Sequence, residues 1–130
     1  MALSVIGRNQ IALNVNSLEW QSLQSASFTA SAGYAYPVDT TSGAITVTLP
    51  ASPATGHTIQ VLDVSATADT NFITLARNGN KINGATTNSA LGKERGVVSV
   101  VYSGSSQGWV VSATAGTGAT SIGQLLTVEA

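Results

Sequence analysis

Alternation of apolar and polar residues with a period of two is the feature that most constrains the fold of this chain. In the segment 44–49, Ile45, Val47 and Leu49 share one face and the residues between them share the other. This pattern is typical of a β-strand with one buried face. Pro50 follows at once, and proline has no N–H to continue a hydrogen-bonded ladder. The segment is therefore predicted to be a short strand that ends before this proline.

The same pattern recurs along most of the chain. Further strands are predicted at 57–64, 71–76, 81–84, 96–102 and 109–112, and the segments 11–15 and 122–128 also fit strands. Short strands about ten residues apart predict an all-β protein: a small antiparallel β-sandwich, barrel-like or prism domain with extended N- and C-terminal arms. Its expected core consists of Ile45, Val47, Leu49, Ile59, Val61, Val98, Val100 and Val110.

The two ends of the chain differ from its centre. We expect three parts: an N-terminal arm or set of first strands at 1–33, a β-domain at 34–112 and a C-terminal arm at 113–130. The segment 17–23 fits either a strand or one helical turn, and its pattern does not decide between them.

Charged residues are scarce along the whole chain. Asp, Glu, Lys and Arg make up 8% of the 130 residues, against about 25% in a typical soluble domain. A surface with so little charge is weakly protected against association, so we expect a subunit that hides part of its surface in an assembly. The net charge of −1 offers no basic stripe to phosphates, which argues against a nucleic-acid partner.

Cysteines, membrane segments and secretion signals are missing from the sequence. The absence of cysteine excludes disulfides, thiolate catalysis and Cys-type zinc sites. No apolar stretch reaches the ~20 residues of a membrane helix, and the N-terminal apolar run is too short for a secretion signal. We therefore expect no membrane partner and synthesis in the cytoplasm.

Residues that carry catalysis or hold cofactors form no recognisable set. His57 is the sole histidine, and no residue stands at a metal-ligand spacing from it. Asp63 and Asp69 are too few for a calcium site, and Asp69 is expected to shape a turn. No catalytic, cofactor-binding or metal residue is predicted, so we expect a protein that is not an enzyme and uses no cofactor.

Two tryptophans and one charged run have alternative interpretations. Trp20 and Trp109 could offer flat apolar platforms to sugars. Trp109 begins a strand, however, and is expected to pack at a core edge, whereas a subunit contact suits Trp20 better. The run Lys93-Glu94-Arg95 is expected to be a solvated loop before the strand at 96–102.

An ordered set of β-elements fills the centre of the chain. It comprises the strand 44–49 with Pro50, Pro53 and Gly56, the segments 59–63, 71–75 and 78–84, and finally 100–102 with Gly108-Trp109. In this order the set resembles a β-domain of tailed-bacteriophage virion proteins, which occurs in tail fibres and in small capsid decoration, or cement, proteins. The resemblance spans 34–112, and the two ends carry none.

The resemblance implies a cement protein that binds the major capsid protein and stabilises the head shell as a homo-oligomer, most often a trimer. Such a protein would be made in the host cytoplasm and would be found on the capsid surface of the virion. We expect decoration because the sequence has 130 residues from Met1, whereas the fibre domains normally belong to much longer chains.

Two other functions compete with decoration. The first is a tail-fibre or receptor-binding module that contacts host-surface glycans. The second is a carbohydrate-active enzyme fragment, which the sequence disfavours because glycoside hydrolysis normally needs two facing carboxylates and the chain has six acidic residues in all.

The N-terminal arm is the part of the chain that we expect to make the partner contact. The apolar residues predicted for this contact are Val5, Ile6, Ile11, Leu13, Val15, Leu18 and Trp20. Left free in water, they would form an exposed patch or an unpaired strand edge, so strand addition to a neighbouring subunit or to the capsid is expected. Their alternation fits equally well a first strand that folds back onto the same sheet.

Overall fold

The computed structural model describes residues 18–114, and this part of the chain contains strands and no helix. No helix long and apolar enough to cross a membrane is found in it. The strands are β1 (Glu19–Trp20), β2 (Phe28–Thr29), β3 (Tyr34–Val38), β4 (Ile45–Thr48), β5 (Thr58–Asp63), β6 (Ile73–Ala76), β7 (Ser89–Leu91), β8 (Val97–Tyr102) and β9 (Trp109–Thr114). The all-β prediction is therefore confirmed for the described residues.

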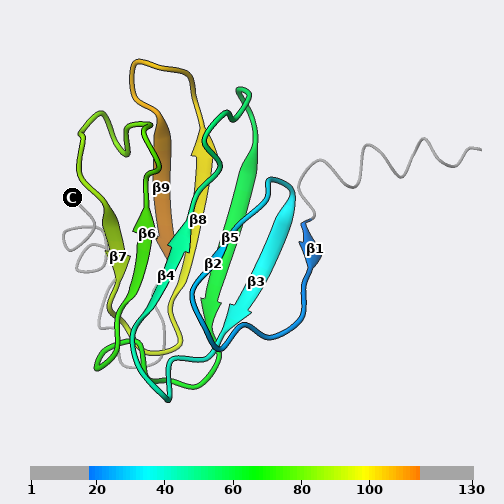
Figure 1. The fold of residues 1–130 in the computed structure, drawn as a ribbon, viewed down its shortest axis with the longest axis vertical. Helices are drawn as coiled ribbons and strands as arrows, with labels where there is room; N and C mark the ends of the chain where they lie inside the picture. Colours follow the sequence, from blue (N-terminus) through cyan, green and yellow to red (C-terminus); the bar gives the residue numbers. More distant parts are fainter. Residues whose placement is uncertain (1–17, 115–130) are drawn as a thin grey trace, which may run out of the picture.

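The strands form two sheets that lie as two layers (Figure 1). One sheet has five strands in the order β1-β3-β5-β8-β9, and the other has four in the order β2-β4-β6-β7. From β1 to β6 the chain changes sheet with every strand. Each strand therefore returns beside the previous strand of its own sheet and runs parallel to it. The pairs that involve β7, β8 and β9 are antiparallel.

The predicted antiparallel arrangement is wrong for the pairs β1–β3, β2–β4, β3–β5 and β4–β6, which are all parallel. Period-two alternation marks a half-buried strand, but it does not fix the direction of the neighbouring strand. Because the chain alternates between the two layers from β1 to β6, successive strands of one sheet run in the same direction. Both sheets are mixed, since the pairs that involve β7, β8 and β9 are antiparallel. Neither sheet closes on itself within the described residues, and no barrel is observed there.

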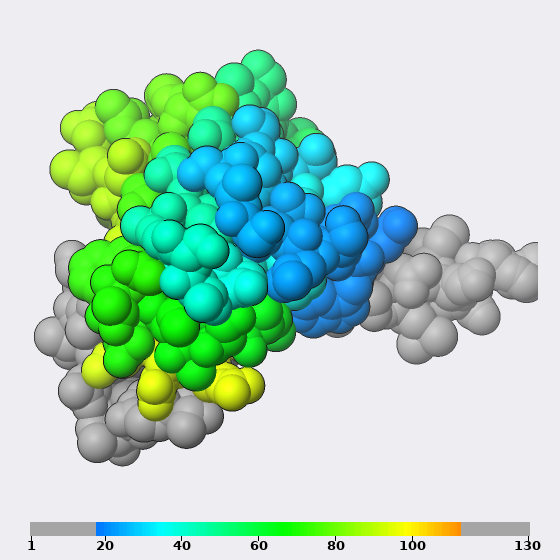
Figure 2. Space-filling view, turned by 60° about the horizontal axis from the view of Figure 1, so that its bottom comes forward, coloured from blue at the N-terminus to red at the C-terminus, as the bar shows by residue number. Residues whose placement is uncertain are grey.

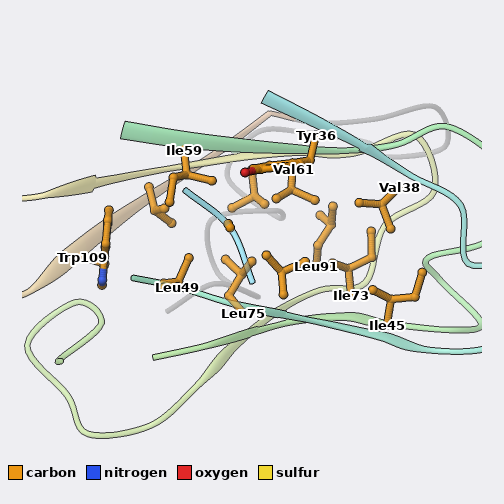
Figure 3. Close-up of a cluster of buried hydrophobic side chains, with 14 of the residues drawn as sticks. Tyr36, Val38, Ile45, Leu49, Ile59, Val61, Ile73, Leu75, Leu91 and Trp109 are labelled. Carbon is orange, nitrogen blue, oxygen red and sulfur yellow. The ribbon is translucent and has the colours of Figure 1, made fainter. Parts of the chain in front are cut away.

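One hydrophobic core lies between the two layers (Figure 3). Ile59 and Val61 point into it from the five-stranded sheet, and Ile73 and Leu75 point into it from the four-stranded sheet. The predicted core residues that are buried as expected are Ile45, Val47, Leu49, Ile59, Val61, Val98 and Val100. Alternation thus correctly predicts core residues in both sheets.

Val110 is the one predicted core residue that the structure places outside. It is 42% exposed, whereas its neighbour Trp109 is 0% exposed, and Val111 is half-buried against the core. A shift of one residue turns every side chain of a strand to the other face. The tryptophan takes the buried position because its side chain removes far more apolar surface from water than a valine does.

Three observed strands were not predicted from the sequence, and one predicted strand, at 81–84, is not observed. β2 and β7 are too short to show alternation, and β3 contains Pro37, which weakens the prediction of a strand. Pro37 is tolerated because β1 pairs only with the first two residues of β3. The segment 81–84 is not a strand but makes single bridges from Ile82 to Ala85 and Trp109. The undecided segment 17–23 contributes strand β1 and, in its described part, no helical turn.

Candidate functional site

The side of the five-stranded sheet that faces away from the core is the first candidate site, and we call it the outer face. Residues in register across the strands point to the same side, so the pairing defines its members. They are Trp20, Ala35, Pro37, Thr58, Gln60, Leu62, Val97, Ser99, Val101, Val110 and Ser112. None of them carries a charge, so ionic repulsion does not protect this face from association.

Large apolar side chains are exposed on the outer face. Trp20 is 56% exposed, Val101 40% and Val110 42%. Between Trp20 and the valine pair lies a polar strip in which the Gln60 amide donates a hydrogen bond to the Ser99 hydroxyl at 3.2 Å. A face with apolar groups and with side chains that both donate and accept hydrogen bonds can pack against a protein surface without leaving a charge unpaired.

The structure describes two of the seven residues that the sequence predicted for partner contact. Trp20 lies on the outer face at the edge strand β1 and is exposed, and Leu18 just before it is half-buried. The other five, Val5, Ile6, Ile11, Leu13 and Val15, lie outside the described residues. The sequence analysis missed Val101 and Val110 as surface residues. The run Gly96-Val-Val-Ser-Val-Val-Tyr102 did hold the signal, because valines at both odd and even positions make both faces of a strand apolar.

A hollow of about 670 Å³ beside strand β7 is the second candidate site. Its apolar part comes from the ring of Phe72, which is 50% exposed, and from the buried Ile82. The remaining lining residues are small or polar: Asn83, Ala85, Thr87, Asn88, Ser89, Ala90, Gly92 and Lys93. Ligand sites commonly combine such an apolar wall with a few polar groups in a volume of this order. The sequence analysis did not identify this hollow, because its residues come from segments that show no pattern.

Backbone hydrogen bonds hold one side of this hollow in place. The N–H of Trp109 donates to the Lys81 carbonyl at 2.8 Å, and the N–H of Asn83 donates to the Trp109 carbonyl at 2.8 Å. Gly108 makes this approach possible, because a Cβ at that position would overlap the Lys81 carbonyl. The segment 81–85 is thus attached to β9.

A polar cluster at the other end of the molecule is structural. The loops around residues 40, 66 and 95 gather there, in cyan, green and yellow (Figure 2). The Asp63 carboxylate is 0% exposed and accepts hydrogen bonds from the backbone N–H groups of Arg95 at 2.9 Å and Ala68 at 3.1 Å, with longer ones from Ser65 and Thr67. These bonds occupy the carboxylate and connect two loops, so Asp63 stabilises the fold.

Asp39 belongs to the same cluster. The hydroxyl of Thr41 donates to its carboxylate at 2.6 Å, the hydroxyl of Ser65 at 2.7 Å and the backbone N–H of Thr41 at 2.9 Å. These hydrogen bonds, that of the Thr41 side chain first, lower the pKa of Asp39 below its ordinary value because they stabilise the charged form. Asp69, the second candidate for a cation site, is exposed. Residues 18–114 contain no group of three His, Cys, Asp or Glu side chains that could hold a metal ion.

The remaining residues that the sequence singled out have structural positions. His57 is exposed, and its Nδ1 accepts a hydrogen bond from the Ala54 N–H at 3.1 Å, which closes the turn before β5. Trp109 is fully buried, with its ring 5.4 Å from that of Tyr102. The buried position of Trp109 leaves no ring face open to a sugar.

Comparison with known proteins adds no family assignment. No protein-family model matches the chain, and no curated protein matches it.

Proposed function

We propose that this chain is a phage structural protein, a capsid decoration or cement protein that binds the major capsid protein and stabilises the head shell. In this proposal it acts as a homotrimer on the capsid surface of the virion after synthesis in the host cytoplasm. The unit that does so is a two-layered β-sandwich with an arm at each end. Its role is mechanical and involves no catalysis, cofactor, nucleic acid or membrane.

The outer face is the observation that carries the proposal. Eleven neighbouring side chains without charge cover one side of the five-stranded sheet, and three large apolar side chains among them are exposed. A face that combines exposed apolar side chains with no charge is poorly protected against association. Burial of one valine or leucine side chain contributes about 1.5–3 kcal/mol, so copies of the chain gain stability when these faces are covered.

The chemistry of the outer face suits contacts between identical copies. In a symmetric assembly the same patch occurs on every subunit, and an interface formed by such patches must be compatible with itself. Charged patches of one sign repel their own copies, whereas the hydroxyl and amide groups of Thr58, Gln60 and Ser99 can both donate and accept. We assign the outer face, with Trp20, to subunit association and the arms, with Leu18 at the base of the N-terminal one, to contact with the shell.

Immunogold labelling tests the proposed function. Antibodies raised against the purified chain would be applied to virions of the phage whose genome encodes it. Gold particles distributed over the heads are the expected result. Gold confined to the tail tip or fibres would overturn decoration in favour of the tail-fibre alternative, and virions without any label would overturn both.

A further inference from the structure

We propose that the hollow beside β7 is a binding site for an acidic saccharide, a sugar that carries a carboxylate group. The proposal does not depend on decoration as the function, since the hollow lies on the four-stranded sheet and shares no residue with the outer face. It assigns a ligand to a surface of the chain that subunit association does not use.

The ring of Phe72 supplies the apolar part of the recognition. A pyranose has one face made mainly of C–H groups, and such a face packs against an aromatic ring, whose own face is electron-rich. Phe72 is half exposed at the start of β6, and its Cε1 would lie 3.3 Å from a Cβ placed on Gly92. The absence of a side chain at Gly92 therefore leaves room for the ring of Phe72, and both residues line the hollow.

The polar lining residues match the hydroxyl groups of a sugar. Asn83, Thr87 and Asn88 are exposed around the hollow, and amide and hydroxyl side chains can donate to or accept from the same sugar hydroxyl. Asn83 Oδ1 accepts from the Val111 N–H at 3.0 Å, and Asn88 Oδ1 accepts from the Arg77 N–H at 3.0 Å. Both amides are thus fixed by their oxygen atoms, and their NH₂ groups are available as oriented donors.

Lys93 gives the site its charge preference. It is the one charged residue in the lining of the hollow, and its ammonium group has no ion-pair partner in the described part of the chain. A carboxylate on the ligand would form a charge-assisted hydrogen bond with this ammonium group, and such a bond is stronger than one to a neutral hydroxyl. The class of ligand that fits all of these groups is a saccharide containing a uronic or sialic acid.

The site requires little rearrangement to bind. The turn at 82–85 closes on itself through hydrogen bonds between Ile82 and Ala85, and the N–H of Asn83 holds it to the Trp109 carbonyl of β9. Asn83 has a φ of 51°, in the left-handed region, and this strained conformation directs the backbone around the turn. Because binding then spends little free energy on ordering, even a small saccharide can bind measurably.

Nuclear magnetic resonance titration tests the proposal with defined probes. Backbone amide shifts of the ¹⁵N-labelled full chain would be followed with trigalacturonate and 3′-sialyllactose as acidic probes and lactose as the neutral one. We expect saturable shifts with at least one acidic probe, centred on residues 82–93 and the amide of Phe72, and weaker binding of lactose. Equal binding of lactose, or no saturable shift in this region with either acidic probe, would overturn the assignment.

Matched substitutions locate the site. Phe72→Ala should weaken binding of the acidic probe about tenfold, while Leu23→Ala, which truncates a side chain of similar exposure elsewhere, should leave it unchanged. Lys93→Gln should weaken it about fivefold, whereas Arg95→Gln removes a charge outside the hollow and serves as its control. A Phe72→Ala protein that keeps its fold by circular dichroism and binds like wild type would contradict the proposal.

Discussion

Val101 of β8 and Val110 of β9 lie directly opposite each other in the antiparallel pair, and both are exposed on the outer face. On the other side of the same two strands, Val100 is buried and Val111 packs against the core. The β8–β9 pair is therefore apolar on both sides, although only one side has a core to cover. An apolar side that stays in contact with water does not stabilise the monomer. Covering it with another subunit removes this surface from water and so stabilises the assembly.

The Val110→Lys substitution tests whether the outer face holds subunits together. We expect the wild-type chain to sediment as a trimer and the variant as a monomer with an unchanged circular dichroism spectrum. Like charges brought together across an interface cost several kcal/mol, whereas an exposed lysine on a strand costs the monomer little. Sedimentation equilibrium at micromolar concentration measures the outcome.

Thr29→Lys is the control for this substitution. Thr29 is exposed at the edge of the four-stranded sheet, so the added charge lies away from the outer face. The control should remain a trimer. A monomeric wild-type chain, or loss of the trimer in both variants, would contradict the assignment of the outer face.

Val47→Asp should destabilise the fold itself. Val47 is 0% exposed in the middle of β4, and a carboxylate there would lack partners among apolar neighbours. We expect a loss of several kcal/mol in the free energy of unfolding, measured by urea denaturation. Thr46→Asp, on the opposite face of the same strand and half-exposed, should cost much less. Equal losses in the two variants would show that the strand is turned the other way.

The long, regular strands could be predicted from the sequence. β4 and β5 show period-two alternation over four to six residues, whereas β8 carries valines on both faces. The core residues predicted in all three strands are buried. The direction of pairing could not be predicted, because it depends on which sheet the chain enters after each turn. The buried face of β9 was also predicted wrongly. Trp109 and Val110 are both apolar, so alternation does not show which of the two side chains is buried.

Asp63→Asn should destabilise the end of the molecule at which the loops around residues 66 and 95 meet. Both carboxylate oxygens of Asp63 accept backbone N–H groups in a fully buried position. An asparagine would present an NH₂ group to some of these donors and leave at least one of them unpaired, at a cost of about 1–3 kcal/mol. Thermal unfolding of the variant and of an Asp69→Asn control, in which an exposed side chain is changed, measures the difference. Equal melting temperatures would contradict the structural role of Asp63.

Asp39 should make the free energy of unfolding depend slightly on pH in the acidic range. Its pKa is lowered in the folded state from the ordinary 3.8, because the hydroxyls of Thr41 and Ser65 and the Thr41 N–H stabilise its charge. The resulting stabilisation is present above the unfolded pKa and is lost as the pH falls through the lower folded pKa. The stability difference between wild type and Asp39→Asn should therefore shrink as the pH is taken below the ordinary value. A stability difference between the two proteins that stays constant over this pH range would contradict the hydrogen bonds described for Asp39.

The candidate sites were only partly accessible from the sequence. Trp20 was predicted as a contact residue from its apolar surroundings, and the structure places it on the outer face. Val101 and Val110 lie side by side on the outer face only because β8 and β9 pair in this register. A pattern within one segment of the sequence does not predict the register between two strands. The hollow depends on Phe72, Ile82 and Lys93, which lie in three different segments and are brought together by the pairing of β6 with β7 and the attachment of segment 81–85 to β9.

A cryo-electron microscopy reconstruction of the virion head on which we propose that this chain acts tests the central claim most directly. We predict density for three copies of the two-layered domain on the outside of the shell, with the outer faces of their five-stranded sheets turned toward one another and the four-stranded sheets exposed. A head without this density, or with bound copies whose outer faces remain open to solvent, would contradict the account.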